Sequence, residues 1–402
     1  MVEFVDAGTL LAALAAGAAS TWAVTSFIRS RLSAEVQRGD DRAAALREEL
    51  LNHKLELAQS QRLLEQARNA HQPDSNRKEL EILNALRKAL DDTTQSLWTS
   101  RAGAAPDAQM LARSPTAPPV LVISNLKGGV GKTTFTVNLG AYFRQKLNKR
   151  VLFIDTDYQG SLTNNLLIAA GSTANVSSSS TWLRFDADPA AVIENAAKLD
   201  NVLPGCALLG SDYRLNEFEM KEQLRWLISE TELDVRFRLS RVLASERVAE
   251  LFDIVLIDAP PRLGTAGVNA LTAADFFLIP TLLTQTSLEP IKQMLALFRG
   301  VFSSLNPRLR LLGVVANQTH YLKGFTRDEQ PRIAPINDVL EAYQPGARFL
   351  SSIIKRQPTI AKLAGNRIAY LNDNDEDVQR SFDALGAEVW ALMEHHRKQQ
   401  IQ

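Results

Sequence analysis

From residue 119 onward, the chain alternates between short apolar runs and longer segments of mixed polarity. The runs lie at residues 119–124, 150–155, 252–260, 276–281 and 309–318. Strands that are buried on both faces of a sheet have continuous apolar stretches rather than alternating ones. The return of such runs with helical segments between them is typical of βαβ units. We therefore expect an α/β domain over residues 119–395, with a mostly parallel sheet flanked by helices.

The beginning of the chain has a different pattern. Residues 7–28 contain no charged side chain, and Arg29 and Arg31 follow them directly. As a helix this segment would span roughly 33 Å, about the thickness of a hydrocarbon core. The positive charges after it would keep the rest of the chain on the cytoplasmic side and the N-terminus outside.

We expect a transmembrane anchor over residues 1–30. Two alternatives remain open: a soluble helix that is buried or self-associating, and a cleaved signal peptide. The signal peptide is the least favoured because no basic region precedes the apolar segment.

Residues 31–100 are expected to be helical. Leu50, Leu57 and Leu64 recur every seven residues, which indicates a short coiled coil. His53 and Ser60 interrupt the second apolar row, so a single amphipathic helix is the alternative.

Turn-forming residues at 71–76 separate this segment from a second predicted helix over 76–98. Prolines and alanines over 101–118 then predict a linker before the α/β domain.

Composition narrows the possible functions only slightly. The chain has 402 residues and a formal net charge of zero, so it lacks the basic excess that marks many nucleic-acid-binding proteins. Its one cysteine, Cys206, excludes a disulfide or a multi-cysteine metal site within one chain. We expect Cys206 to be a small core residue.

The stretch "VLVISNLKGGVGKTT", residues 120–134, predicts a strand, a glycine-rich loop and the start of a helix. This context is the one that a Walker A phosphate loop requires. Backbone N–H groups of such a loop surround phosphate oxygens at a helix N-terminus, which favours anions. Lys132 would reach the β- and γ-phosphates, and Thr133 would bind Mg²⁺ through its hydroxyl. The predicted nucleotide-binding residues of the loop are Gly128, Gly129, Val130, Gly131, Lys132, Thr133 and Thr134.

"KGGVGKTT" resembles the deviant Walker A motif of the ParA/MinD ATPases. In that family the first lysine, which matches Lys127, reaches across a dimer to the phosphates of the partner's nucleotide. The resemblance covers about residues 119–393 and implies a P-loop NTPase fold, ATP and Mg²⁺ as cofactors, and a homodimer that forms on ATP binding.

Two further blocks resemble the same family. "VLFIDTDYQGSLT", residues 151–163, is similar to its switch I segment. There the resemblance implies that Asp157 positions the attacking water and that Asp155 lies near the metal. Tyr158 stands where the family commonly has proline.

The second block, residues 252–280, is similar to the Walker B and switch II segment. Asp258 ends a predicted buried strand, where a carboxylate can hold Mg²⁺ through water. Arg262 replaces a common serine, and it either contacts a partner or is solvated. Asn317 ends another apolar strand, where it either reads adenine by resemblance or caps the strand. The predicted catalytic residues are thus Lys127, Lys132 and Asp157, and the predicted metal site comprises Thr133, Asp155 and Asp258.

These features together favour an ATPase that switches between monomer and dimer and positions or recruits an unidentified protein partner or cargo. The apolar segment places it on the cytoplasmic side of the inner membrane as a single-pass protein, with a cytoplasmic location as the alternative. A soluble partitioning ATPase would instead bind DNA nonspecifically through basic residues at 236–247 and 355–356, which is possible but not favoured. A nucleotide-binding scaffold with little hydrolysis is the third hypothesis, because Tyr158 and Arg262 depart from the family pattern.

Overall fold

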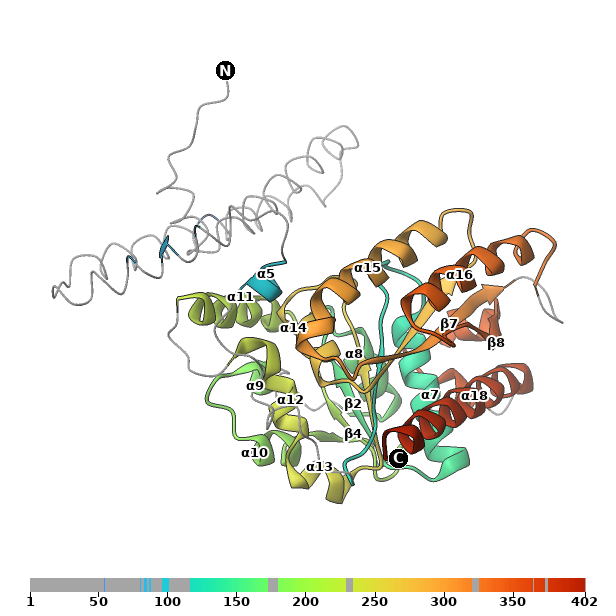
Figure 1. The fold of residues 1–402 in the computed structure, drawn as a ribbon. Coiled ribbons are helices and arrows are strands. Elements are labelled where there is room, and N and C mark those ends of the chain that lie inside the picture. Colours follow the sequence, from blue (N-terminus) through green and yellow to red (C-terminus); the bar gives the residue numbers. More distant parts are fainter. Residues whose placement is uncertain are drawn as a thin grey trace, which may run out of the picture. The chain divides into compact units, whose positions relative to one another are not determined.

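The computed structural model describes residues 116–172, 180–228, 234–319, 325–363, 365–372 and 375–401, together with residues 96–100 and a few isolated earlier positions (Figure 1). The apolar segment 7–28 lies outside the described residues. The same holds for nearly all of the leucine-rich segment 31–69 and for most of the second predicted helix 76–98 and the predicted linker 101–118. Within those that are described, no helix combines the length and the apolar character needed to cross a bilayer.

The chain divides into two units. The smaller comprises residues Met1–Arg101 and Gln223–Glu232, and the larger comprises Ala102–Glu222 and Leu233–Gln402. In the smaller unit, Trp98 of the short helix α5 (Leu97–Ser100) stacks on Trp226 with ring centroids 6.3 Å apart. The larger unit contains the α/β domain.

An eight-stranded sheet forms the centre of the larger unit, in the order β3-β4-β2-β5-β1-β6-β7-β8. Every neighbouring pair is parallel except β3 and β4, which are antiparallel. The predicted mostly parallel sheet is therefore confirmed. The strands are β1 (Val120–Ile123), β2 (Val151–Asp155), β3 (Ala197–Lys198), β4 (Ala207–Leu209), β5 (Ile254–Asp258), β6 (Phe276–Leu282), β7 (Arg310–Thr319) and β8 (Phe349–Lys355).

Helices connect these strands and flank the sheet (Figure 1). They are α7 (Lys132–Leu147), α8 (Ser161–Ala169), α9 (Ser180–Leu183), α10 (Pro189–Glu194), α11 (Arg214–Leu227), α12 (Arg238–Leu243), α13 (Glu246–Leu251), α14 (Thr265–Ala273), α15 (Leu288–Leu305), α16 (Ile333–Tyr343), α17 (Pro358–Leu363) and α18 (Glu376–Ile401), with single 3-10 turns at Val235–Phe237, Gln330–Arg332 and Ala369–Leu371.

Successive side chains of the buried strands pack against helices on opposite faces of the sheet, as the two-residue period of a strand requires. Phe276 belongs to the core cluster that contains α7 and α18, whereas Phe277 packs on Phe298 of α15 with ring centroids 5.6 Å apart. Cys206 is buried in the first cluster, so its prediction as a core residue is confirmed.

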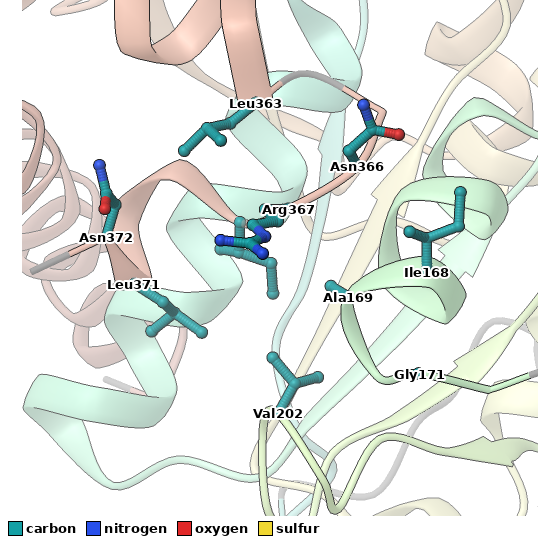
Figure 2. Close-up of a pocket in the computed structure, with 10 residues that line it drawn as sticks. Ile168, Ala169, Gly171, Val202, Leu363, Asn366, Arg367, Leu371 and Asn372 are labelled. Atoms are coloured by element: carbon teal, nitrogen blue, oxygen red, sulfur yellow. The ribbon is translucent and has the colours of Figure 1, made fainter.

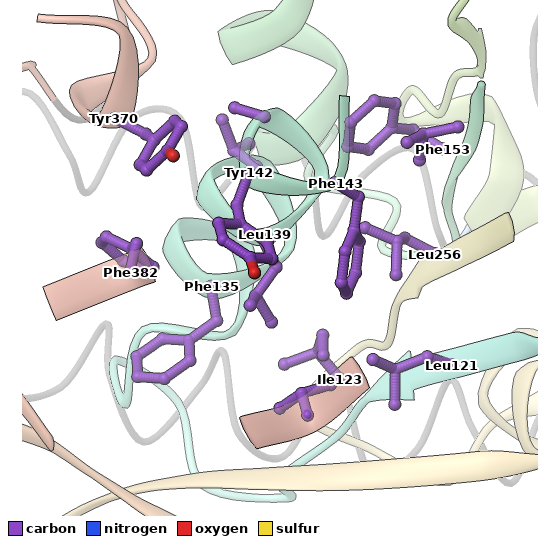
Figure 3. Close-up of a cluster of buried hydrophobic side chains, with 14 of the residues drawn as sticks. Leu121, Ile123, Phe135, Leu139, Tyr142, Phe143, Phe153, Leu256, Tyr370 and Phe382 are labelled. Carbon is purple, nitrogen blue, oxygen red and sulfur yellow. The ribbon is translucent and has the colours of Figure 1, made fainter. Parts of the chain in front are cut away.

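Helix α7, which follows the phosphate loop, is anchored deep in this cluster (Figure 3). Phe135 and Phe143 are fully buried, and Phe135 makes an edge-to-face contact with Phe382 of α18 at 6.0 Å between centroids. Aromatic pairs of this geometry add about 0.5–1.5 kcal/mol beyond their area burial. The first turn of α7 is therefore held rigidly where it meets the nucleotide site.

Candidate nucleotide site

The phosphate loop connects β1 to α7 at the carboxyl end of the sheet. Gly129 and Gly131 have φ angles of 73° and 98°, a left-handed conformation that side chains disfavour. A Cβ atom on Gly131 would also lie 2.3 Å from Nδ2 of Asn317. Because Gly131 is the N-cap of α7 and no side chain caps the helix, the first amides remain available for phosphate oxygens.

Asn317 extends from β7 to the back of this loop. Its Nδ2 donates a hydrogen bond to the Val130 carbonyl at 2.8 Å, and its side chain is buried. Asn317 therefore supports the loop in this structure, which is a contact that neither of the sequence-based alternatives describes. A role in binding adenine stays a prediction.

The two lysines of the loop lie in different environments. Lys132 is 8% exposed, and its Nζ donates to the Lys127 carbonyl at 3.3 Å. Burial lowers the pKa of Lys132, although the charges of Asp258 and Asp157 oppose that shift. Lys127 is half-buried, and its backbone N–H donates to Oδ1 of Asn125 at 2.8 Å. The backbone at Lys127 is therefore fixed at the edge of the site.

Asp258 and Thr133 meet where a magnesium ion is expected. The Thr133 hydroxyl donates to Oδ2 of Asp258 at 2.6 Å. The other carboxylate oxygen, Oδ1, is buried and has no hydrogen-bond partner among the described residues. Burial, and next the charge of Asp155, raise the pKa of Asp258 well above its ordinary value. Mg²⁺ prefers oxygen ligands. The Thr133 hydroxyl and the Asp258 carboxylate, whose Oδ1 has no partner among the described residues, supply such ligands, so these residues fit the ion.

Asp155 lies beside Asp258, since the two residues are in register on neighbouring strands. It is fully buried, and Oδ2 accepts hydrogen bonds from the Thr163 hydroxyl at 2.7 Å and the Thr163 N–H at 2.9 Å. Its Oδ1 accepts from the Asp157 N–H at 3.0 Å. Burial raises the pKa of Asp155 to about 7, and these hydrogen bonds oppose the shift. In this structure Asp155 fixes the switch I loop, and its role as a metal ligand remains a prediction.

Asp157 follows in that loop and is half-buried. Its Oδ1 accepts from the Gln159 N–H at 3.1 Å, and its carbonyl accepts from the Gly160 N–H at 2.9 Å. These bonds form a tight turn that leaves one carboxylate oxygen for other contacts. The geometry is compatible with a water-positioning carboxylate.

One buried residue near the site was not predicted from the sequence. Glu219 of α11 is 5% exposed and pairs with Arg262. A helical spacing places it on one face with Leu215 and Glu222, both of which are also buried. That spacing was the available signal, but charged residues are so often solvated that it is weak.

The basic stretch at 236–247 does not form an exposed patch over its whole length. Arg236 and Arg238 are 3% and 2% exposed, and they pair with Asp234 and Glu222 respectively. Arg247 pairs with acidic residues at the surface. Two arginines that the DNA-binding hypothesis placed at the surface are therefore inside the protein.

A cavity of about 600 Å³ lies away from the phosphate loop (Figure 2). Figure 2 shows the Arg367 side chain near its centre, with Leu371 on one side, Ile168 on the other and Val202 below. None of the predicted site residues lines it. The lining residues are Ile168, Ala169, Gly171, Val202, Leu363, Asn366, Arg367, Ile368, Leu371 and Asn372.

A phosphate loop at the carboxyl end of a parallel sheet, followed by aspartates at the ends of β2 and β5, defines a P-loop ATPase. Comparison with known proteins identifies the family. Residues 119–311 match the AAA domain family. The chromosome partitioning protein ParA of Caulobacter vibrioides is 36% identical over 198 residues, which cover 49% of this chain and 68% of ParA. The sporulation initiation inhibitor protein Soj of Bacillus subtilis is 35% identical over 198 residues, which cover 49% of this chain and 71% of Soj.

The chain belongs to the ParA family, and it is an ATPase. The resemblance inferred from the three sequence blocks is thus confirmed. Among solved structures, that of a Cyanothece McdA variant in complex with ATP has a TM-score of 0.52 and 22% identity, and covers 68% of this chain and 96% of McdA. This likeness supports the P-loop NTPase fold.

Proposed function

We propose that this chain is an ATP-dependent switch that pairs with a second copy and, in the paired state, recruits or positions a partner protein. ATP and Mg²⁺ are its ligands. The observation that carries the proposal is the unequal placement of the two loop lysines. Lys132 is buried within its own site, whereas Lys127 lies half-buried at the edge, on a backbone fixed by Asn125.

Each residue has a distinct part in the proposed hydrolysis. Amides of the loop and the ammonium of Lys132 hold the β- and γ-phosphates, and Thr133 and Asp258 hold the metal ion. Bound Mg²⁺ neutralises charge on the phosphate oxygens. Asp157 orients the attacking water. Phosphoryl transfer depends mainly on positioning and charge stabilisation, so the partner's Lys127 would make turnover conditional on pairing.

Pairing is tested by the mass of the purified full chain in solution, measured by light scattering with ATP and Mg²⁺. We expect Asp157→Ala to accumulate as a dimer with ATP, because it binds nucleotide but cannot position water. Lys127→Ala in the same background should remain monomeric. A dimer of equal stability in both variants would contradict the role of Lys127.

We further propose that the apolar segment 7–28 tethers the switch to the cytoplasmic face of the inner membrane, with the N-terminus outside. Its uncharged length and the arginines after it support this. A tether would also raise the local concentration of the chains and so favour pairing. Cell fractionation of the full chain and of a deletion of residues 7–28 is the test. A full chain recovered entirely in the soluble fraction would refute the tether.

A further inference from the structure

The two residues that depart from the family pattern contact each other. Tyr158 lies in the loop after β2, and Arg262 lies in the loop after β5, 104 positions later. The Arg262 guanidinium carbon is 5.1 Å from the centroid of the Tyr158 ring. This cation–π contact joins the loop that holds Asp157 to the loop that follows Asp258.

The other side of Arg262 is anchored to α11. Its Nη2 lies 2.5 Å from Oε2 of Glu219 and 3.2 Å from Oδ1 of Asn216. The second carboxylate oxygen of Glu219 accepts from the Ala266 N–H at 2.6 Å, in the first turn of α14. Glu219 is buried, and a buried carboxylate is stable only when it is paired or hydrogen-bonded. The anchor for Arg262 is therefore rigid.

We propose that Arg262 is a positioning residue that fixes the switch I loop through Tyr158 and so holds Asp157 in place for hydrolysis. The inference rests on the proposed function of Asp157. A proline at position 158 would restrict the backbone through its fixed φ angle. In this chain the restriction comes instead from a side-chain contact between the loops. The Tyr158 ring also contacts Tyr213, which is 72% exposed, with ring centroids 6.4 Å apart.

The loop itself provides the first test, which requires no catalysis. Amide hydrogen exchange of residues 156–160 is measured in the nucleotide-free full chain, where Asp155, Asp157 and Asp258 accept the hydrogen bonds of the loop amides. We expect Arg262→Ala and Tyr158→Ala to accelerate this exchange about two- to five-fold, the range of an exposed cation–π contact. Tyr158→Phe keeps the ring and should match the wild type.

The matched control is Arg380→Ala on α18, which removes an exposed arginine paired with Asp377. It should leave exchange at 156–160 unchanged. Unchanged exchange in both Arg262→Ala and Tyr158→Ala would overturn the inference, as would equal acceleration in Arg380→Ala.

ATP turnover provides the second test. Arg262→Ala should lower kcat about two- to five-fold with KM for ATP unchanged, because the phosphate loop is intact. The double variant with Tyr158→Ala should be no slower than either single variant, since both break the same contact. Additive losses would overturn the inference. If the wild type itself hydrolyses no ATP, the proposed function fails, and the exchange experiment still decides the role of Arg262.

Discussion

At Asp258, the buried carboxylate that metal binding requires should lower the stability of the metal-free protein. The carboxylate is 1% exposed, and Oδ1 has no hydrogen-bond partner among the described residues. Asp155 adds a second buried carboxylate on the neighbouring strand. Without a metal ion, the charge of Asp258 is stabilised mainly by the Thr133 hydroxyl at 2.6 Å. We therefore predict that Asp258→Asn stabilises the protein in the absence of nucleotide and metal.

The expected gain follows from the general cost of buried charge. Replacing buried ionic groups by apolar residues of similar volume is often neutral or stabilising by about 1–4 kcal/mol, and we take this range as the upper limit for a neutral amide in place of the Asp258 carboxylate. Asparagine places a donor where Oδ1 has no partner, which costs about 1 kcal/mol or more. A net gain of about 1–2 kcal/mol should raise the Tm by about 2–8 °C, because each kcal/mol shifts the Tm of a domain of this size by about 2–4 °C. The assay is thermal unfolding of the full chain in a chelator.

Adding ATP and Mg²⁺ should reverse the order. The wild type gains the stability that ligand binding provides. Asp258→Asn loses an oxygen ligand and should bind ATP and Mg²⁺ weakly, so it gains less. Its turnover should fall about 100-fold or more, the usual loss when a transition-state electrostatic contact is removed. A variant that is less stable than the wild type in the chelator would refute this reasoning.

Asp253, just before the first residue of the same strand, is the matched control. Arg150 donates to it from its backbone N–H at 2.8 Å and from its guanidinium at 3.0 and 3.1 Å. Burial alone would raise the pKa of Asp253, but these hydrogen bonds hold it below its ordinary value. Asp253→Asn should therefore destabilise the protein by about 1–2 kcal/mol. The aspartates at the two ends of β5 would thus give opposite results.

The pH dependence of the Asp258→Asn effect follows from the same shift. Because the folded-state pKa of Asp258 is raised, the wild type loses stability as the pH rises from the unfolded-state value toward the folded-state value. Below pH 4 both states are protonated and this loss is absent. The Tm difference between variant and wild type should widen from pH 4 toward neutral pH.

Two further predictions concern contacts of α18. Glu388 of α18 accepts hydrogen bonds from the N–H groups of Ser351 and Ser352 in β8. Burial would raise the pKa of Glu388, but hydrogen bonds from the side chains and backbone of these two serines hold it below the ordinary value. Glu388→Gln should therefore cost about 1–2 kcal/mol near neutral pH and less as the pH falls through the folded-state pKa, measured by urea unfolding. Gly386→Ala would place a Cβ 2.2 Å from the Tyr142 ring and should destabilise the α7–α18 contact by about 1–3 kcal/mol. Gly300→Ala on α15 is the control. A Cβ at this position would contact no other atom within 4 Å, so the substitution should be neutral or stabilising in the same assay.

The sequence predicted those parts of the fold and site that are encoded locally. Each apolar run forms a buried strand because its side chains are apolar on both faces, and only a sheet covered by helices on both sides removes them all from water. The residues from Asn125 to Thr134 form the expected loop because glycine spacing and the following helix determine its geometry. Asp155 and Asp258 end neighbouring strands, which the shared carboxyl edge of a parallel sheet makes predictable.

The unpredicted features depend on contacts between distant segments. Arg262 was expected to be solvated or to contact a partner; it is exposed, and it also pairs with Glu219, 43 residues away, which the sequence did not predict. Arg238 was assigned to a basic surface, but it is buried beside Glu222. A charged residue in a polar helix has the same local pattern whether it faces water or a buried partner. Only the packing of α11 and α12 against the rest of the domain distinguishes the two.

Lys127 is proposed to act on the nucleotide of a second chain, and mixing two inactive variants tests this role. Lys127→Ala keeps an intact phosphate site but lacks the lysine that would be lent to its partner. Lys132→Ala keeps Lys127 but loses its own phosphate contact. We predict that neither variant alone hydrolyses ATP and that their mixture does, because a mixed pair contains one complete site. A mixture as inactive as its components, in spite of detectable pairing, would show that Lys127 does not act on the partner's nucleotide.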